Sequence, residues 1–200
     1  MKLISSPTSP FVRKVRVLIR EAHLTDAVTE APVTTTALNS AAEALAANPI
    51  GKIPALIRPE GPAIFDSRVI CRYLDDHAGA GLYPASRLWE VLTLEALADG
   101  ITEAALAMAY EVRLRPEGER SPAWVEAQWQ KVARGIAAVE DLWMNHLTGP
   151  LNAGQIAVGC MLGYVDFRHG DRGWRDTHPA LAKWFEGFDA RPSMAATRPE

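Results

Sequence analysis

The sequence has very few cysteines and no apolar run long enough to cross a bilayer. Its two cysteines, Cys71 and Cys160, lie far apart and form no CxxC pair. This spacing argues against a disulfide framework or a cysteine-rich zinc site and fits a reducing compartment. The N-terminus, MKLISS, lacks the long apolar segment of a signal peptide. We therefore expect a cytoplasmic protein with no metal site and no association with a membrane.

The sequence also lacks a large excess of either charge. Lys and Arg number 21 against 24 Asp and Glu, a formal net charge of −3, so no general attraction to nucleic acid is expected. Hydrophobic residues make up 48% and charged residues 22%, as in globular proteins. With 200 residues, the chain can form one ordinary domain or two small ones and bury a real core.

The first third of the chain alternates short apolar runs with helical patterns. Apolar residues recur at helical spacing from Phe11, and an alanine-rich helix is expected to end at Asn48-Pro49. The sequence PEGP between two apolar runs is typical of a turn. The predicted order is β-α-β-α-β-β-α, with strands at 1–4, 27–34, 53–58 and 63–66 and helices from 11, over 37–47 and over 67–76.

Strand patterns end after residue 76, and only helical patterns follow. The stretch HAGAGLYPAS is rich in glycine and contains a proline, which is typical of a linker. We therefore predict an α/β domain over residues 1–77, a linker over 78–86 and an all-α domain over 87–200. Long helices are expected at 88–115, 122–147, 152–168 and 179–190.

Three short stretches contain residues suited to binding a ligand. The first is SSPTSPFVRKV, in which Ser9 before Pro10 is a typical helix start, with a cap that contributes about 1 kcal/mol. The same helix end has unpaired N–H groups and a partial positive charge, which stabilise an anion. A hydroxyl there can also donate a hydrogen bond to a thiolate. The local pattern leaves both interpretations open and favours the simple cap.

The second and third stretches are NPIGKIPAL and FDSRVICRYLDD. A cis bond between Ile53 and Pro54 would leave the Ile53 backbone free to pair with a peptide-like ligand, although a trans proline at a strand start is more common. Asp66 and Ser67 lie at a strand-to-helix junction, where Ser67 is expected to cap the helix. The free N–H groups there suit a carboxylate ligand, and Asp66 suits an ammonium group. A capped helix beside a solvated aspartate is the simpler alternative.

All three stretches precede a helix or strand on the same side of a small sheet, so together they would form a cleft for a small peptide with a thiol, a carboxylate and an amine. The patterns NP-x-G-K-x-P-x-L and DS-x-x-I-x-x-Y-L, with SxTSPFVRK in the first loop, resemble those of the cytosolic glutathione S-transferases, in particular a bacterial group. The resemblance covers essentially the whole chain. It implies a thioredoxin-like domain followed by a helical bundle, with glutathione as co-substrate and no other cofactor.

The resemblance assigns expected roles in glutathione binding. Ile53, before the cis Pro54, would pair with the cysteinyl backbone of glutathione. Asp66 and Ser67 would hold its γ-glutamyl end. Lys52 would contact the glycyl end or remain solvated.

The resemblance places the catalytic position in the first loop. Ser9 stands where cysteine-type relatives have CPF, here SPF, and Thr8 is the alternate; Phe11 of SPF is also expected to contact glutathione. Because this loop has no tyrosine and no cysteine, a tyrosine-type mechanism and mixed-disulfide chemistry through a protein thiolate are both disfavoured. Cys71 and Cys160 lie in helical apolar patterns and are expected to be packed in the core.

The implied reaction is attack by the glutathione thiolate on a small hydrophobic electrophile, which would make the protein a glutathione transferase. A free thiol with a pKa near 8.5 is mostly protonated at neutral pH, so the protein must lower that pKa. The Ser9 hydroxyl and the helix N-terminus would do so. Arg13, one turn further on, would add positive potential or simply be solvated.

The helical domain is expected to contact the electrophile. Met108, Tyr110 and Trp124 are candidates for that wall, although each is more typical of a core position. Relatives carry a Ser/Thr-x-x-Asp capping box at the start of the central helix, and here Asn152-x-x-Gln155 takes its place.

The resemblance further implies a homodimer. The helices over 67–76 and 88–113 would form its interface, with contributions from Arg68, Arg72 and Trp89. Two alternative functions stay open: a non-catalytic interaction or stress-regulator protein with the same fold, and a glutathione-dependent isomerase, reductase or dehalogenase.

Overall fold

The computed structural model describes residues 1–199, which divide into two compact units. The first unit comprises Met1–Leu88 together with the chain from Pro192 onward, and the second comprises Trp89–Arg191. The first contains a small mixed sheet covered by helices, and the second is all-helical. This confirms the predicted fold class. Within residues 1–199, no helix combines the length and the apolar character needed to cross a bilayer.

The sheet of the first unit has three strands in the order β2-β1-β3. Strand β1 (Lys2–Ser5) pairs in parallel with β2 (Thr29–Pro32) and antiparallel with β3 (Ala55–Ile57). The strand predicted over 63–66 is reduced to one bridge, in which Ile64 exchanges backbone hydrogen bonds of 2.8 and 2.9 Å with Leu56. Pairing stops there because Pro62, two residues earlier, has no N–H, and the next helix begins at Ser67, three residues later.

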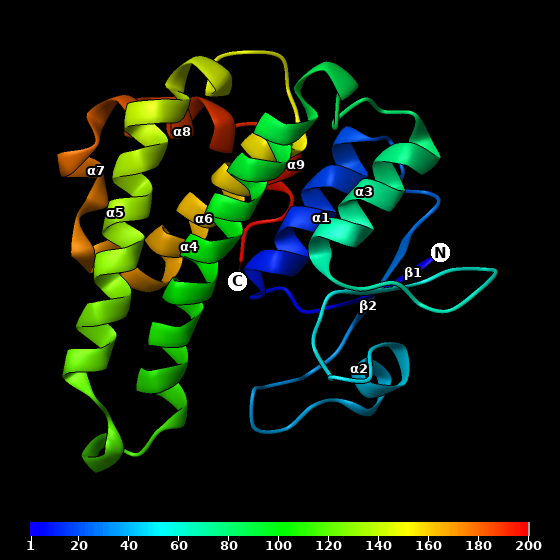
Figure 1. Ribbon diagram of the computed structural model, residues 1–200. Helices are drawn as coiled ribbons and strands as arrows, with labels where there is room; N and C mark the ends of the chain where they lie inside the picture. The colour runs from blue at the N-terminus through cyan, green and yellow to red at the C-terminus, as the bar shows by residue number, and fades with distance from the viewer. Residues whose placement is uncertain (200) are drawn as a thin grey trace. The chain divides into compact units, whose positions relative to one another are not determined.

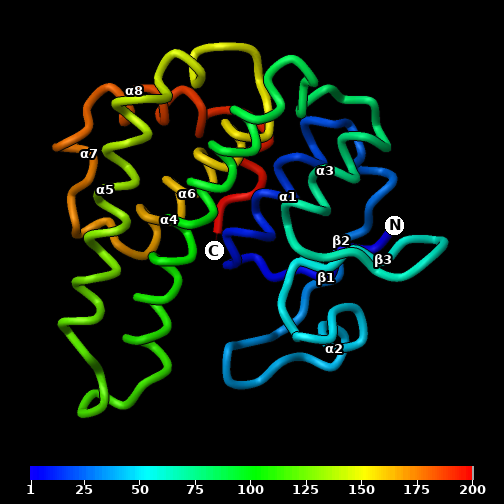
Figure 2. The backbone as a smooth tube through the Cα atoms, in the orientation of Figure 1, coloured from blue at the N-terminus to red at the C-terminus, as the bar shows by residue number. Residues whose placement is uncertain are grey.

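Helices cover both faces of this sheet (Figures 1 and 2). Helices α1 (Pro10–Glu21) and α3 (Ser67–Ala78) pack together on one face, and α2 (Ala42–Ala47) lies against the other. Consecutive residues of β1 are therefore buried, since alternate side chains point to opposite faces. Beneath α2 a small core joins Ile4 and Ala55 of the sheet to Ala44 and Ala47 of the helix.

Helix α2 is shorter than the predicted helix over 37–47. The Thr36 hydroxyl accepts hydrogen bonds from the N–H groups of Leu38 (3.3 Å) and Asn39 (3.0 Å), which stabilise a turn before the helix. Such local side-chain bonds compete with helix formation. The helix begins only at Ala42.

The C-terminal segment differs from the predicted division, which placed all residues after 86 in the helical domain. Helix α9 (Pro192–Ala195) packs on α1 of the first unit. The Arg13 guanidinium donates to the Met194 carbonyl (3.2 Å), and the Ser193 hydroxyl donates to the Glu21 carboxylate (2.5 Å). Met194 and Thr197 are fully buried, so the segment is part of the first unit's core.

The second unit follows the predicted helices closely. They are α4 (Leu88–Leu114), α5 (Pro122–Leu147), α6 (Ala153–His169) and α8 (Pro179–Asp189), with the unpredicted single-turn α7 (Trp174–Thr177) between the last two. Short 3₁₀ turns at Glu117–Glu119 and Gly170–Arg172 lie between these helices, and a third at Ala85–Arg87, in the first unit, precedes α4.

Helix α6 begins with the predicted capping box. The Asn152 side chain accepts hydrogen bonds from the N–H groups of Gly154 (3.0 Å) and Gln155 (3.3 Å), and the Gln155 side chain accepts one from the Asn152 N–H (2.8 Å). Neutral partners thus satisfy the orphan donors of this buried helix end. The prediction for this motif is confirmed.

Candidate functional site

The register of the sheet brings the three predicted ligand-binding stretches to one edge. Because Ile4 pairs antiparallel with Ala55, the end of β1 meets the start of β3. Because Leu56 pairs antiparallel with Ile64, the residues after Ile64 run beside those before Leu56. The loop before α1, the residues before β3 and the start of α3 therefore share this edge. The N-termini of helices α1 and α3 therefore also lie at this edge.

Ser9 caps helix α1, as predicted. Its backbone is extended, and its Oγ accepts a hydrogen bond of 3.3 Å from the Val12 N–H. Accepting this bond leaves the hydroxyl proton available for donation to a second partner. Thr8, Ser9 and Phe11 are all partly exposed, so a ligand at this helix end can reach each of them.

Asn48 organises the loop before β3, and the sequence did not identify it as a site residue. Its side-chain N–H donates to the Lys52 carbonyl (2.9 Å), and its side-chain oxygen accepts from the Ile50 N–H (3.2 Å). Gly51 adopts φ +66°, and a Cβ there would lie 2.4 Å from the Ser40 Oγ. The Asn-Pro pair before this glycine was the available signal, because buried asparagine side chains often complete turns.

The peptide bond between Ile53 and Pro54 is cis, so the cis alternative is the correct one. Within the described residues, the Ile53 N–H and C=O make no backbone hydrogen bond. Ile53 is partly exposed, Lys52 is exposed and Pro54 is buried. The Ile53 main chain therefore offers a donor and an acceptor at the sheet edge.

Asp66, and not Ser67, caps helix α3. The Asp66 carboxylate accepts a hydrogen bond of 2.9 Å from the Arg68 N–H, whereas Ser67 is the first helical residue and is buried. The predicted cap was therefore one residue late. Asp66 can fill the position because its short carboxylate reaches the Arg68 N–H in the first turn while its backbone stays extended. The bond between Phe65 and Asp66 is also cis.

The surroundings of Asp66 favour its charged form. Partial burial raises the pKa of the carboxyl, but the hydrogen bond from the Arg68 N–H and the charges of Arg68 and Lys14 outweigh it, and the pKa lies below its usual value. Lys14 and Arg13 of α1 are both buried. The alternative in which Arg13 is simply solvated is therefore wrong. The site thus combines an ionised carboxylate with nearby cationic groups.

The other candidates are distributed as follows. Met108 is buried in the core of the second unit, whereas Tyr110 and Trp124 are 37% and 39% exposed. Burial raises the pKa of the Tyr164 hydroxyl to about 12, and the nearby Tyr110 makes a smaller contribution in the same direction. Both cysteines are buried, as predicted, and form no disulfide within residues 1–199.

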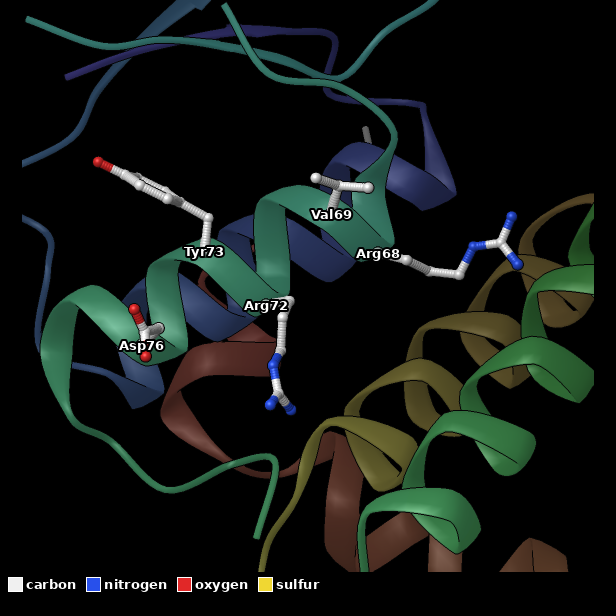
Figure 3. A pocket seen from close by; sticks show the side chains of 5 residues that line it. All are labelled: Arg68, Val69, Arg72, Tyr73 and Asp76. Carbon is white, nitrogen blue, oxygen red and sulfur yellow. The ribbon is translucent and has the colours of Figure 1, made fainter. Parts of the chain in front are cut away.

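A second feature of the first unit is a hollow on the outer face of α3. It has a volume of about 510 Å³ and is lined by Arg68, Val69, Arg72, Tyr73 and Asp76, whose side chains project from this helix (Figure 3). Val69, one of these lining residues, is 50% exposed.

Comparison with known proteins gives consistent matches. Residues 8–77 match the family model for the glutathione S-transferase N-terminal domain, and residues 122–187 match the model for the C-terminal domain. The GST-like protein YibF of Escherichia coli is 35% identical over 205 residues, which cover 100% of this chain and 98% of YibF.

Among solved structures, a glutathione transferase family member from Pseudomonas fluorescens with bound glutathione is 40% identical, with a TM-score of 0.96 over 100% of this chain and 98% of that chain. A second structure from that organism, with bound S-(propanoic acid)-glutathione, is also 40% identical, with a TM-score of 0.92 over 100% of both chains.

Proposed function

The chain belongs to the glutathione S-transferase family, and from that premise we propose that it binds glutathione at the sheet edge, stabilises its thiolate and transfers it to a small hydrophobic electrophile. The observation that carries the proposal is the register of the sheet. It brings two helix N-termini to one place with the Ile53 main chain, which makes no backbone hydrogen bond within residues 1–199.

Each part of glutathione has a matching group at this edge. The Ile53 N–H and C=O pair with the cysteinyl main chain as a short β-augmentation. The Asp66 carboxylate receives the γ-glutamyl ammonium group, and the N-terminus of α3 at Ser67 receives the γ-glutamyl carboxylate. Lys52 is exposed and offers a cation to the glycyl carboxylate.

The sulfur then lies at the N-terminus of α1. The Ser9 hydroxyl donates a hydrogen bond to it while its oxygen caps the helix, and the partial positive charge of the helix end adds to the effect. Both interactions favour the thiolate, so the thiol proton is released to solvent. The thiolate electron pair forms a carbon–sulfur bond, and the electrophile either expels a leaving group or takes up a proton.

The relatives support this proposal. The Pseudomonas family member has been solved with glutathione and with a derivative substituted on the sulfur. The two buried cysteines, which form no disulfide within the described residues, also suit a reducing compartment, and we propose the cytoplasm for this chain.

Isothermal titration calorimetry with glutathione tests the binding step. The unaltered protein should bind, and Asp66→Asn should bind at least tenfold more weakly, because the ammonium group loses an ionised partner. Glu60→Gln, which neutralises an exposed carboxylate in the preceding turn, is the control. Absence of binding by the unaltered protein would exclude the proposal and favour the non-catalytic interaction protein.

A panel of electrophiles then separates the reactions. Formation of a stable thioether identifies conjugation, whereas an isomerised, reduced or dehalogenated product with release of glutathione identifies one of the alternative reactions. Failure with every electrophile despite glutathione binding would contradict the catalytic part.

We also propose a homodimer that uses the outer face of α3. The hollow there is lined by the exposed Val69, by the cations of Arg68 and Arg72 and by the carboxylate of Asp76, a mixture of groups that is suited to a self-complementary contact. Helix α4 exposes Trp89 and would contribute as well. Sedimentation should show a dimer that Val69→Glu dissociates. Leu142→Glu, at an exposed position of α5, should leave it intact.

A further inference from the structure

Asn48 is a buried polar residue at the end of helix α2, and it connects both ends of the short loop that follows. Its side chain is 2% exposed. The side-chain oxygen accepts from the Ile50 N–H (3.2 Å), and the side-chain N–H donates to the Lys52 carbonyl (2.9 Å). The Asn48 carbonyl also accepts from the Gly51 N–H at 2.8 Å. One buried residue therefore determines the course of the backbone from 48 to 52.

The bond to Lys52 also sets the direction of the next N–H group. The peptide between Lys52 and Ile53 is trans, so its C=O and N–H point to opposite sides. Because the carbonyl points toward the buried Asn48 side chain, the Ile53 N–H points away from it. That N–H makes no backbone hydrogen bond within residues 1–199. It is therefore a donor whose direction is fixed before any ligand binds.

Gly51 shows that this loop has little room to shift. Its φ angle is +66°, which disfavours other residues, and a Cβ there would lie 2.4 Å from the Ser40 Oγ and 2.7 Å from the Ser40 Cβ. The loop thus packs closely against the chain that precedes α2. A group held in its bound orientation loses less entropy on binding, so this packing favours a ligand that needs the Ile53 donor.

The amide of Asn48 does more than close a turn. An aspartate would accept the same bond from the Ile50 N–H, and aspartate is as common as asparagine in turns of this kind. Only the amide also has an N–H to donate to the Lys52 carbonyl. The amide donor is therefore the group that controls the orientation of the peptide before Ile53.

We propose that Asn48 is a positioning residue for glutathione binding, which aims the Ile53 N–H at the cysteinyl carbonyl of the ligand. It acts through the backbone of Lys52 and Ile53. This inference rests on the proposed glutathione site and assigns a role in it to a residue behind the binding surface.

Asn48→Asp tests the proposal by calorimetry on the full chain. The variant keeps the shape and the acceptor of Asn48, but it loses the donor and places a carboxylate against the Lys52 carbonyl. The dissociation constant for glutathione should rise at least tenfold, because a buried acceptor loses its partner and the Ile53 N–H loses its fixed direction. Asn39→Asp adds the same charge at an exposed position of the same unit and should bind like the unaltered protein.

A second ligand separates positioning from general loosening of the unit. γ-Glutamylcysteamine has the γ-glutamyl group and the thiol but lacks the cysteinyl carbonyl, so it offers no acceptor to the Ile53 N–H. It should bind the unaltered protein more weakly than glutathione does, and Asn48→Asp should scarcely change its affinity, measured by competition. The thiolate titration of bound glutathione should also stay the same, because Ser9 and helix α1 are unaltered.

Three outcomes would overturn the inference. If the unaltered protein does not bind glutathione, the proposed function fails and the role of Asn48 fails with it. If the unaltered protein binds and Asn48→Asp binds equally well, only the role of Asn48 is wrong. Equal losses for glutathione and γ-glutamylcysteamine would show that Asn48 merely stabilises the unit. If Asn48→Asp does not fold, Asn48→Ala, which removes the same donor without adding a charge, must show the selective loss.

Discussion

At the scale of single residues, Ser9 combines two roles that measurement can separate. Its oxygen accepts the cap hydrogen bond from Val12, and its proton remains available for the glutathione sulfur. In Ser9→Ala, both interactions are lost. A hydrogen bond to a charged group contributes about 1.5–3 kcal/mol, so the pKa of bound glutathione should rise by about one to two units. The ultraviolet absorbance of the thiolate as a function of pH measures this shift.

Ser121→Ala is a matched control for the cap. Ser121 also precedes a proline, and its Oγ accepts a hydrogen bond of 3.3 Å from the Trp124 N–H at the start of α5. Both variants should lose about 1 kcal/mol of stability, but only Ser9→Ala should change the thiolate titration. An unchanged titration in Ser9→Ala, with a shift in Thr8→Val, would assign the donor role to Thr8.

A second residue, His169, links stability to pH. Burial lowers its pKa below the usual value, although the hydrogen bond of its Nε2 to the Ala105 carbonyl (2.8 Å) and the charge of Asp171 act in the opposite direction. As pH falls below about 6.5, the unfolded chain takes up this proton before the folded one does. The contribution of His169 is therefore complete above that pH and is lost below it.

His169→Gln keeps a side-chain donor for Ala105 but cannot titrate. Chemical denaturation between about pH 7 and 5 should show a smaller decrease in the free energy of unfolding than in the unaltered protein. Asp66, whose pKa is also lowered, acts below about pH 4 and does not overlap with this range. An equal pH dependence in both proteins would contradict the assignment.

At the scale of elements, sequence patterns predicted what depends on local chemistry. The Ser-Pro starts of α1 and α5 and the capping box of α6 follow from neighbouring residues and are confirmed. The predicted length of the strand over 63–66 was wrong, because a strand's length depends on where its pairing with β3 stops. In the site, Asn48 and the cap by Asp66 were missed, since both depend on the course of the folded backbone.

Helix α8 shows a cap that no local pattern reveals. Its own cap residue, His178, makes no side-chain capping bond; Glu140 of α5 supplies an oxygen that accepts from the N–H groups of Ala180 (2.9 Å) and Leu181 (3.2 Å). The other Glu140 oxygen lies 2.8 Å from His178 Nδ1. A carboxylate at a helix N-terminus also interacts favourably with the helix dipole.

Glu140→Ala should therefore destabilise the second unit by about 1–3 kcal/mol, because these donors lose their acceptor. Thermal unfolding measures the change. Glu126→Ala is the control on the same helix: it removes an exposed ion pair of 2.7 Å with Arg172 and should cost clearly less. Equal losses in the two variants would show that the Glu140 bonds add nothing beyond a surface ion pair.

At the scale of the whole molecule, the chain returns to its first unit after completing the second. The segment from Pro192 inserts Met194 and Thr197 into the core beside α1, and the Met194 carbonyl accepts from the buried Arg13. Periodicity could not reveal this return, because a single helical turn of four residues carries too little pattern to show where it packs.

Truncation after Arg191 should therefore loosen the unit that contains the proposed glutathione site, although it removes residues far from that site in sequence. Loss of Met194 alone leaves a cavity, and Met194→Ala should cost about 2–5 kcal/mol. Hydrogen exchange should accelerate in α1, whose N-terminus carries Ser9, and glutathione affinity should fall with it. Truncation after Thr197 keeps the buried contacts and is the control. Faster exchange in α5 and α8 alone, with α1 unchanged, would contradict this dependence of the first unit on the C-terminal segment.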